Sequence, residues 1–222
     1  MENATMIEFQ DVCKRLGNTV VLNHANLRVE RGECVAIVGP SGAGKTTLLR
    51  LVAGLEMPDS GSILLRGVDA GRDGSLLPPY QRAIGFQFQD SALWPHMSLL
   101  QNLAYGLNGD KSRALECLKR AGLSELASRL PAEVSGGEAR RAALARALAP
   151  ENDIVLLDEP LSNLQKSLRV EIANWIAREL QAVHAACLWV THDPSDTEGI
   201  ATRVLTIEDG ELRETSTQPA QT

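Results

Sequence analysis

The amino-acid sequence predicts an α/β fold: a mostly parallel sheet wrapped by helices, with an antiparallel β-subdomain at the N-terminus and an inserted helical subdomain. Apolar runs at residues 34–38, 154–157 and 186–190 have the character of buried strands. Segments with helical periodicity separate them, and this alternation is typical of a parallel sheet covered by helices. With 222 residues, the chain is long enough for one large domain with a smaller inserted unit.

The first half of the chain is predicted to consist mainly of strands. Apolar and polar residues alternate between positions 6 and 31, with a turn at Gly17-Asn18. Gly, Asp and Pro are frequent from Gly67 to Pro79, which indicates an exposed loop. The other elements predicted in this half are a buried strand at 34–38, a helix at 45–53, a strand at 62–66 and a strand at 84–89 that ends with Gln89.

Helical periodicity dominates the second half. Leu115, Leu118, Ala121 and Leu126 recur at helical spacing, which indicates an inserted helical subdomain at approximately 91–150. We expect residues 1–215 to form a single domain and 216–222 to be a polar tail. The elements predicted after the subdomain's first helices are a helix at 138–149, a strand at 154–159, a helix at 165–183, a strand at 186–191 and a hairpin around Asp209-Gly210.

Composition argues against several classes of protein. The net charge of −6 and the absence of a basic stripe disfavour nucleic-acid binding. The four cysteines are far apart without C-x-x-C spacing, which argues against zinc and redox motifs and fits a reducing compartment. The first residues lack the pattern of a signal peptide, and no apolar run approaches membrane-spanning length. We expect any work at a membrane to require a partner.

One stretch fits the phosphate-binding pattern G-x-x-x-x-G-K-[ST] between a buried strand and a helix. Backbone N–H groups of such a loop surround a polyphosphate at the positive end of the helix. Lys45 is expected to reach the β- and γ-phosphates, and the Thr46 hydroxyl to bind Mg²⁺. This pattern predicts a P-loop NTPase without saying how the nucleotide is used. The residues expected to cradle the phosphates are Gly39, Pro40, Ser41, Gly42, Ala43, Gly44, Lys45, Thr46 and Thr47.

Two further motifs narrow the use of the nucleotide. Asp158 and Glu159 end a buried strand, where Asp158 would hold Mg²⁺ through its water shell and Glu159 would polarise an attacking water. Adjacent acids there favour hydrolysis over group transfer. Ser135-Gly136-Gly137 precedes a helix and forms a second anion site. We expect this second site to bind the nucleotide of a neighbouring copy.

In this order, over roughly residues 6–213, the motifs resemble those of nucleotide-binding subunits of ATP-binding cassette (ABC) transporters. The resemblance implies that ATP and Mg²⁺ are the cofactors and that residues 39–47 are the Walker A loop. It further implies that Gln89 is the Q-loop glutamine, which touches Mg²⁺ and senses the membrane partner. Ser135, Gly136 and Gly137 would contact the γ-phosphate of ATP on the opposite subunit. Asp158 and Glu159 would be the Walker B aspartate and the catalytic glutamate, and His192 the switch histidine that senses the γ-phosphate.

Three residues depart from the family pattern. Leu16 stands where the family commonly stacks an aromatic ring on adenine, so we expect a weaker apolar contact with the base. Glu138 replaces a glutamine, and we expect its carboxylate to point away from phosphate. Gln165 replaces an aspartate that bridges the dimer, which keeps hydrogen bonding and loses a charge.

The segment from Pro78 to Ser98 is similar to bacterial importer ATPases for small solutes and ions. One phosphate loop and one signature require a second ATPase subunit, identical or homologous. We expect a cytoplasmic protein, peripheral on the inner face of the cell membrane, that works with an integral membrane subunit and a solute-binding protein. A groove beside Gln89 and residues 90–107 would receive a helix of the membrane subunit. The apolar residues expected to supply contact area there are Leu93, Trp94, Met97, Leu99 and Leu100.

Two alternative functions remain open at this point. The ATPase could drive export or extraction of a lipid, peptide or drug through a separate membrane protein. It could also be a soluble ATP-dependent regulator with weak turnover, which Leu16 and Gln165 motivate. Many importer ATPases add a regulatory domain after the core, and here the residues stop soon after the hairpin, so we expect no regulation of that kind.

Overall fold

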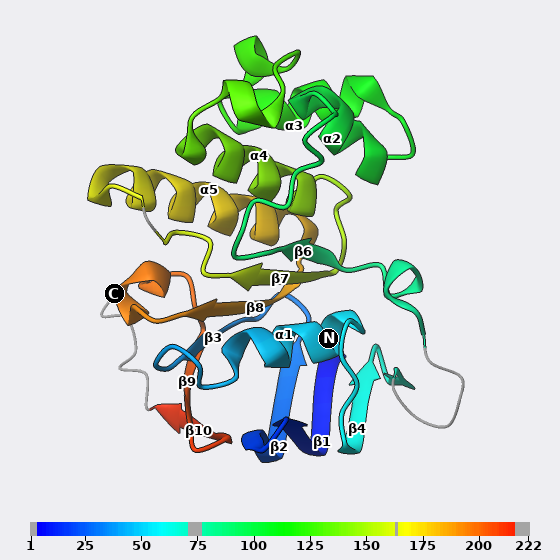
Figure 1. The fold of residues 1–222 in the computed structure, drawn as a ribbon, viewed down its shortest axis with the longest axis vertical. Coiled ribbons are helices and arrows are strands. Elements are labelled where there is room, and N and C mark those ends of the chain that lie inside the picture. The colour runs from blue at the N-terminus through cyan, green and yellow to red at the C-terminus, as the bar shows by residue number, and fades with distance from the viewer. Residues whose placement is uncertain (1–3, 71–76, 163, 216–222) are drawn as a thin grey trace.

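The computed structural model describes residues 4–70, 77–162 and 164–215 (Figure 1). This part of the chain consists of two sheets with a helix between them and two further layers of helices. The predicted polar tail at 216–222 lies outside the described residues, as do residues 71–76 of the loop predicted between Gly67 and Pro79. Among the described helices, none is both long enough and apolar enough to cross a membrane.

A six-stranded sheet forms the centre of the molecule, in the order β10-β9-β3-β8-β7-β6. Its three innermost strands are almost entirely buried because helices or strands cover both faces, and their pairing is parallel. Only the pair β9–β10 is antiparallel. This arrangement confirms the predicted mostly parallel α/β sheet. The strands are β3 (Cys34–Val38), β6 (Gly85–Gln87), β7 (Ile154–Asp158), β8 (Ala186–Thr191), β9 (Arg203–Glu208) and β10 (Glu211–Thr215).

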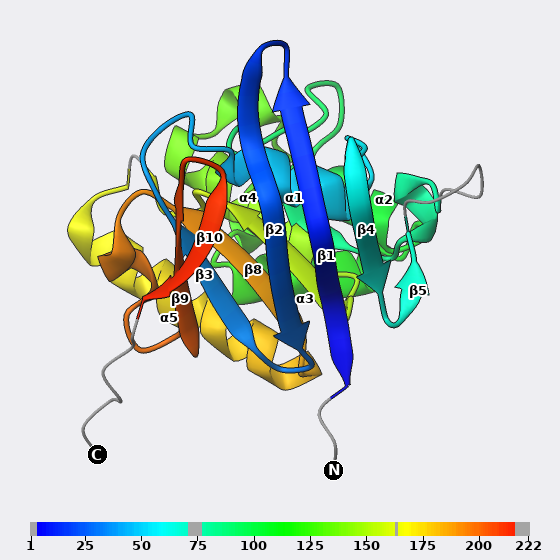
Figure 2. The same cartoon turned by 90° about the horizontal axis from the view of Figure 1, so that it is seen from below.

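A second, antiparallel sheet is formed by the N-terminal third of the chain, in the order β2-β1-β4-β5. Helix α1 (Lys45–Ala53) lies between the two sheets, as Figures 1 and 2 show. Apolar side chains of both sheets and of α1 form one continuous core. The strands of this sheet are β1 (Thr5–Leu16), β2 (Thr19–Glu30), β4 (Ser60–Leu65) and β5 (Val68–Asp69).

Helices cover the opposite face of the six-stranded sheet and form a second core with it. Figure 1 shows α4 and α5 against the sheet and α2 and α3 stacked beyond them. The bounds are α2 (Leu99–Gly106), α3 (Lys111–Arg120), α4 (Gly136–Leu148) and α5 (Lys166–Val183). Four short 3₁₀ helices connect these elements: η1 (Pro79–Gln81), η2 (Ser124–Leu126), η3 (Pro131–Glu133) and η4 (Pro194–Thr197).

Several predicted boundaries differ from the structure. Helix α4 begins at Gly136 rather than Glu138, because Ser135 caps it by accepting a hydrogen bond from the Glu138 N–H. Gln89 lies two residues beyond the end of β6 instead of ending that strand. Leu115 was expected on the apolar helix face but is 45% exposed, while Leu118 is fully buried.

Candidate nucleotide-binding site

The loop at residues 39–47 connects β3 to α1, and two of its glycines are required by close backbone approaches. Gly44 has φ 101°, and a Cβ atom there would lie 2.5 Å from the carbonyl oxygen of Val21. A Cβ atom at Gly39 would lie 2.8 Å from the carbonyl oxygen of Ile207. The loop is therefore held tightly between the antiparallel sheet and β9.

Lys45 is the buried cation of this loop. Its side chain is 5% exposed, and Nζ donates to the carbonyl oxygens of Gly39 at 2.8 Å and Pro40 at 2.9 Å. Burial lowers the pKa of Lys45, while the nearby carboxylates of Glu159 and Asp158 oppose that shift. The ammonium is thus held by carbonyl groups that an anion can replace.

Thr46 and Asp158 present two oxygens to each other from different elements. The Thr46 Oγ1 hydroxyl, in the first turn of α1, donates to Asp158 Oδ1 at 3.2 Å, at the end of β7. Burial raises the pKa of Asp158, and the hydrogen bond from Thr46 opposes the rise. No cluster of three or more His, Cys, Asp or Glu side chains in the described ranges is arranged to hold a metal. A hydroxyl and one carboxylate match Mg²⁺, which binds few protein ligands and retains water or phosphate oxygens.

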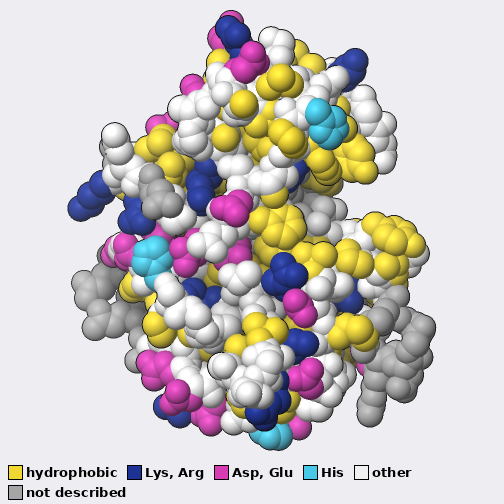
Figure 3. Space-filling view, in the orientation of Figure 1, with side chains coloured by type: hydrophobic (Ala, Val, Ile, Leu, Met, Phe, Trp, Pro, Cys, Tyr) yellow, Lys and Arg dark blue, Asp and Glu magenta, His cyan; other side chains and the backbone are white. Residues whose placement is uncertain are grey.

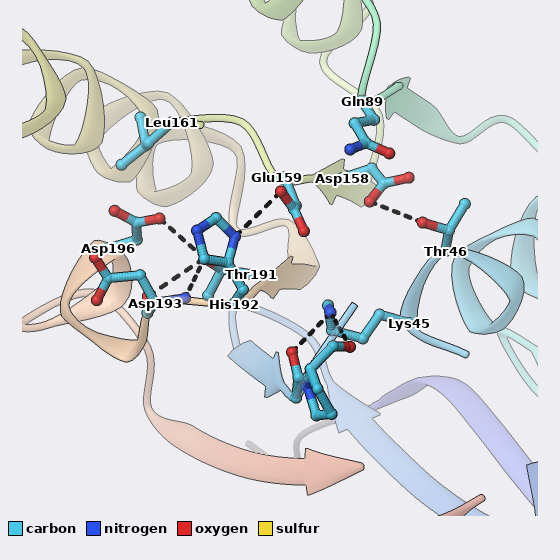
Figure 4. A network of polar contacts seen from close by, with 12 residues as sticks. Lys45, Thr46, Gln89, Asp158, Glu159, Leu161, Thr191, His192, Asp193 and Asp196 are labelled. Carbon is cyan, nitrogen blue, oxygen red and sulfur yellow. Dashed lines mark hydrogen bonds and ion pairs between the residues drawn. The ribbon is translucent and has the colours of Figure 1, made fainter. Parts of the chain in front are cut away.

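Glu159 is held by its backbone and by a histidine. Its φ of 46° lies in the left-handed region, which is unfavourable for a residue other than glycine. Its N–H donates to the Val190 carbonyl at 3.0 Å, so the residue is tied to β8. One carboxylate oxygen, Oε2, lies 3.2 Å from Nδ1 of His192 (Figure 4). The side chain is thereby oriented from the end of β8.

A network of polar contacts behind His192 was not predicted from the sequence. The Thr191 hydroxyl donates to Asp196 Oδ2 at 2.9 Å. Arg169 of α5 pairs with Asp193 at 3.2 Å and donates to the carbonyl oxygen of Leu161 at 3.1 Å. A cavity of about 680 Å³ lies beside this network. It is lined by Leu161, Arg169, Asp193 and Asp196, among others, and by no residue of the 39–47 loop. The sequence shows two carboxylates, Asp193 and Asp196, within four residues after His192, and these could have indicated a polar network. Their partner Arg169 lies 24 positions before Asp193, so the pairing could not be predicted.

A smaller cavity collects most of the residues predicted to bind nucleotide. Its volume is about 220 Å³. Cavities that enclose a small ligand usually measure roughly 300–1,000 Å³, so this one forms only part of the wall around a nucleotide. Leu16 is 46% exposed at this site, and the Gln89 side chain is drawn beside Asp158 in Figure 4. The lining residues are Leu16, Val21, Ser41, Gly42, Gly44, Lys45, Thr46, Thr47, Gln89 and Glu159.

The segment Ser135–Gly137 is not part of this cavity. Both glycines have open or ordinary surroundings, and Ser135 caps helix α4. The Glu138 side chain was predicted to point away from the anion site, but it turns back toward Ser135. Its Oε2 accepts hydrogen bonds from the backbone N–H and the hydroxyl of Ser135, both at 2.7 Å. These contacts lower the pKa of Glu138. The capping box satisfies an unpaired N–H group at the helix start, which explains the orientation.

An aromatic groove of about 340 Å³ lies between the helical layer and the edge strand β6. Figure 3 shows the gathered hydrophobic side chains at this indentation. Phe86 and Phe88 stack with ring centroids 4.1 Å apart, and Trp94 lies 4.6 Å from Tyr105. The Arg146 guanidinium stands 4.8 Å over the Trp94 ring. Of the five apolar residues expected here only Trp94 lines the groove. Leu99 is fully buried in the core, and the exposed Tyr105 was missed.

Comparison with known proteins agrees with this geometry. The family described as ABC transporter matches residues 22–162. The Fe(3+) ions import ATP-binding protein FbpC of Rhizobium etli is 41% identical over 95% of this chain and 61% of its own length. The sulfate/thiosulfate import ATP-binding protein CysA of Rhodopseudomonas palustris is also 41% identical, over 94% of this chain and 62% of its own. The chain therefore spans about three-fifths of the length of these relatives.

A solved structure extends the comparison to the fold. The post-hydrolysis dimer of the ATP-binding cassette MJ0796, bound to ADP and Pi, has a TM-score of 0.87 and 31% identity. The alignment covers 96% of this chain and 99% of that one. The matched family region includes the 39–47 loop, Gln89, Ser135–Gly137 and Glu159. On this ground the chain belongs to the ABC transporter family, in its ATP-binding cassette fold.

Proposed function

We propose that this chain binds ATP with Mg²⁺, hydrolyses it to ADP and phosphate, and powers an importer through a separate membrane subunit. The observation that carries the proposal is the convergence of Lys45, Thr46 and Glu159 on one cavity. Asp158 joins them through its hydrogen bond with Thr46. The relatives named as import ATP-binding proteins support the importer reading over export.

The residues present fit a magnesium nucleotide. Lys45 exchanges its two carbonyl partners for phosphate oxygens, since a charge-assisted contact with an anion is stronger than one with a neutral carbonyl. Thr46, Asp158 and Gln89 would supply the oxygens for Mg²⁺. When bound, Mg²⁺ neutralises charge on the phosphates. The backbone N–H groups of residues 39–47 and the start of α1 orient the polyphosphate.

Glu159 is the proposed general base. Its carboxylate lines the cavity and accepts a proton from the attacking water, while His192 holds Oε2 and limits rotation of the side chain. The left-handed backbone at Glu159 and its bond to Val190 fix where the side chain starts. Holding the base and the attacking water in a fixed geometry lowers the barrier to hydrolysis.

A second subunit completes the proposed site. The cavity beside the 39–47 loop is too small to enclose a nucleotide, and Ser135–Gly137 presents a helix N-terminus that lies outside it. Two copies, or one copy and a homologue, would each place this segment over the other's ATP. The dimeric relative of known structure supports this arrangement. ATP stabilises the closed pair, and hydrolysis loosens it.

The aromatic groove is the proposed contact with the membrane subunit. Tyr105 is exposed and Trp94 is half-buried, and together they form an apolar, aromatic surface suited to a helix of the partner. The chain would then work in the cytoplasm, peripheral on the inner face of the membrane. A solute-binding protein is expected to deliver the solute. The membrane and solute-binding subunits, rather than this chain, would select it.

The decisive experiment compares phosphate release by the wild-type chain with that of Glu159→Gln. Glutamine keeps the size of the side chain but cannot take the proton, so turnover should fall by about a hundredfold or more while ATP binding is retained. Glu171→Gln, an exposed acid on α5, serves as the matched control and should behave as wild type. Undiminished phosphate release from Glu159→Gln would refute the assigned role.

A further inference from the structure

Arg140 joins the segments that follow β6 and β7. It lies in the second turn of α4, five residues after the capping Ser135. Its Nη1 donates to the carbonyl oxygen of Glu159 at 2.7 Å, and its Nη2 donates to the carbonyl oxygen of Gln89 at 2.8 Å. The two arms of one planar guanidinium therefore hold two loop backbones that lie 70 positions apart in the sequence.

The Glu159 end of this contact holds a strained backbone. A left-handed φ at a residue with a side chain costs of order 1–3 kcal/mol and persists only where neighbours determine it. Three hydrogen bonds hold the backbone of this residue: its N–H to Val190 at 3.0 Å, the Ser162 N–H to its carbonyl at 3.1 Å, and the Arg140 bond. The Arg140 bond is the shortest of the three, and it is the one that carries a charge.

Electrostatics favours the same placement of the guanidinium. Burial lowers the pKa of Arg140, and the carboxylates of Asp90, Glu159 and Asp158 oppose the shift. Arginine stays charged in spite of partial burial, and its fork places two donors in fixed directions. Lysine would offer one ammonium to two separated carbonyls, and glutamine one uncharged amide.

We propose that Arg140 is a positioning residue that fixes Glu159 and Gln89 and ties them to helix α4, which Ser135 caps. The inference rests on the proposed function, in which Glu159 is the base. Arg140 acts through the backbone of that residue and is not among the residues that line the nucleotide cavity. A shift of α4 against the sheet would move the Arg140 guanidinium, which donates to both carbonyl oxygens. The Ser135–Gly137 segment, which serves the neighbour's nucleotide, is in this way linked to the chain's own hydrolytic residue.

The link predicts a specific kinetic signature. Displacing a reacting group by about 1 Å can cost roughly a hundredfold in rate, whereas nucleotide contacts made by the 39–47 loop are untouched. Arg140→Ala should therefore lower kcat for ATP hydrolysis by at least about tenfold, with KM for ATP changed by less than about threefold. Arg140→Lys should recover part of the lost kcat, and Arg140→Gln less.

The experiment measures kcat, KM and hydrogen exchange on the purified full chain. Hydrogen exchange at peptides covering 88–90 and 158–162 should quicken in Arg140→Ala without nucleotide present, because the carbonyl anchors are lost. Arg178 is the matched control, since it is exposed on α5 and donates within its own helix, to the Asn174 carbonyl at 3.3 Å. Arg178→Ala should keep wild-type kinetics and exchange.

The results of these measurements either support or overturn the positioning role of Arg140. Wild-type kcat together with wild-type exchange in all three Arg140 variants would overturn the inference, and so would a loss confined to KM. If Arg140→Ala fails to fold, the lysine and glutamine variants give the same comparison. A wild-type chain without ATPase activity would defeat the proposed function, while faster exchange at 158–162 would still support the positioning role.

Discussion

Leu16 lines the nucleotide cavity at the position where an aromatic residue is expected from the family pattern. It ends β1, is 46% exposed and lines the cavity together with Val21. A branched aliphatic side chain offers dispersion contacts to a purine but no π-face. The loop 39–47 is therefore expected to supply most of the ATP affinity through the phosphates, and the base to contribute little.

Introducing a ring at this position should tighten binding. Leu16→Tyr is expected to lower the Kd for ATP by about threefold to tenfold, because aromatic stacking adds roughly 0.5–1.5 kcal/mol. The measurement is an equilibrium titration with ATP and, separately, with inorganic triphosphate. Val20→Tyr is the control, since Val20 is 41% exposed and does not line the cavity. Equal tightening toward triphosphate would contradict a contact with the base.

At the level of elements, Asp153 joins the two sheets. It precedes β7 and accepts hydrogen bonds from Arg66, which follows β4, with Nε at 3.0 Å from Oδ1 and 3.1 Å from Oδ2. Arg31, which follows β2, pairs with the same carboxylate at 3.2 Å. These partners lower the pKa of Asp153, first through the Arg66 hydrogen bonds. The charged form is thus favoured in the folded state.

The sign of the pH dependence follows from that lowered pKa. Between the folded pKa and the unfolded value near 4, the unfolded chain binds more protons, so the contribution is complete above about pH 4 and is lost as the pH falls through the folded pKa. Asp153→Asn should lower the free energy of unfolding at pH 7 by about 1 kcal/mol. Urea unfolding of the wild type and the variant at pH 7, 5 and 3 measures this loss. The difference in free energy of unfolding between the two proteins should persist at pH 5 and shrink at pH 3.

Glu151 provides the comparison for this test. It pairs with Arg113 at 3.3 Å, and both side chains are about half exposed. Glu151→Gln should change the free energy of unfolding by less than about 0.5 kcal/mol at any of these pH values. If the free energy of unfolding lost in Asp153→Asn did not change with pH, the charge of Asp153 would not be the source of its stabilising contact with Arg66 and Arg31.

At the scale of the whole molecule, the proposed function makes this cassette one half of a dimer. In the Glu159→Gln background, ATP should convert the monomer to a dimer, as measured by light scattering. Adding Gly136→Asp should abolish that dimer, because a carboxylate would meet the triphosphate of the other copy. The fold should tolerate the change, since no atom lies within 4 Å of a Cβ built at Gly136 and an acid suits a helix start.

A matched acid on another helix controls for charge alone. Ser112→Asp adds a carboxylate in the first turn of α3, where the side chain is exposed. In the same Glu159→Gln background it should leave the ATP-driven dimer intact. A dimer that survives Gly136→Asp would remove Ser135–Gly137 from the proposed interface.

The parts of the fold and site that the sequence predicts correctly depend on residues that are close together in the chain. The 39–47 loop, the acids after β7 and the helix over Lys45–Ala53 depend on neighbouring residues, and the capping box of Ser135 and Glu138 was also readable from its S-x-x-E spacing. Arg140 could not be found in this way. Its partners are 51 and 19 positions away, and only the folded chain brings them together. The same holds for Arg169 and for the groove residue Tyr105.

The pairing of β3 has a consequence for synthesis of the protein. This apolar strand, which leads into the 39–47 loop, pairs only with β8 and β9, so about 150 residues must follow before it gains a partner. At roughly 5–20 residues per second, the ribosome needs about 8–30 s to supply them. The antiparallel sheet can form earlier from β1, β2 and β4. Until β8 emerges, the nascent chain exposes an unpaired apolar strand, which makes this interval the one in which chaperones and aggregation compete for it.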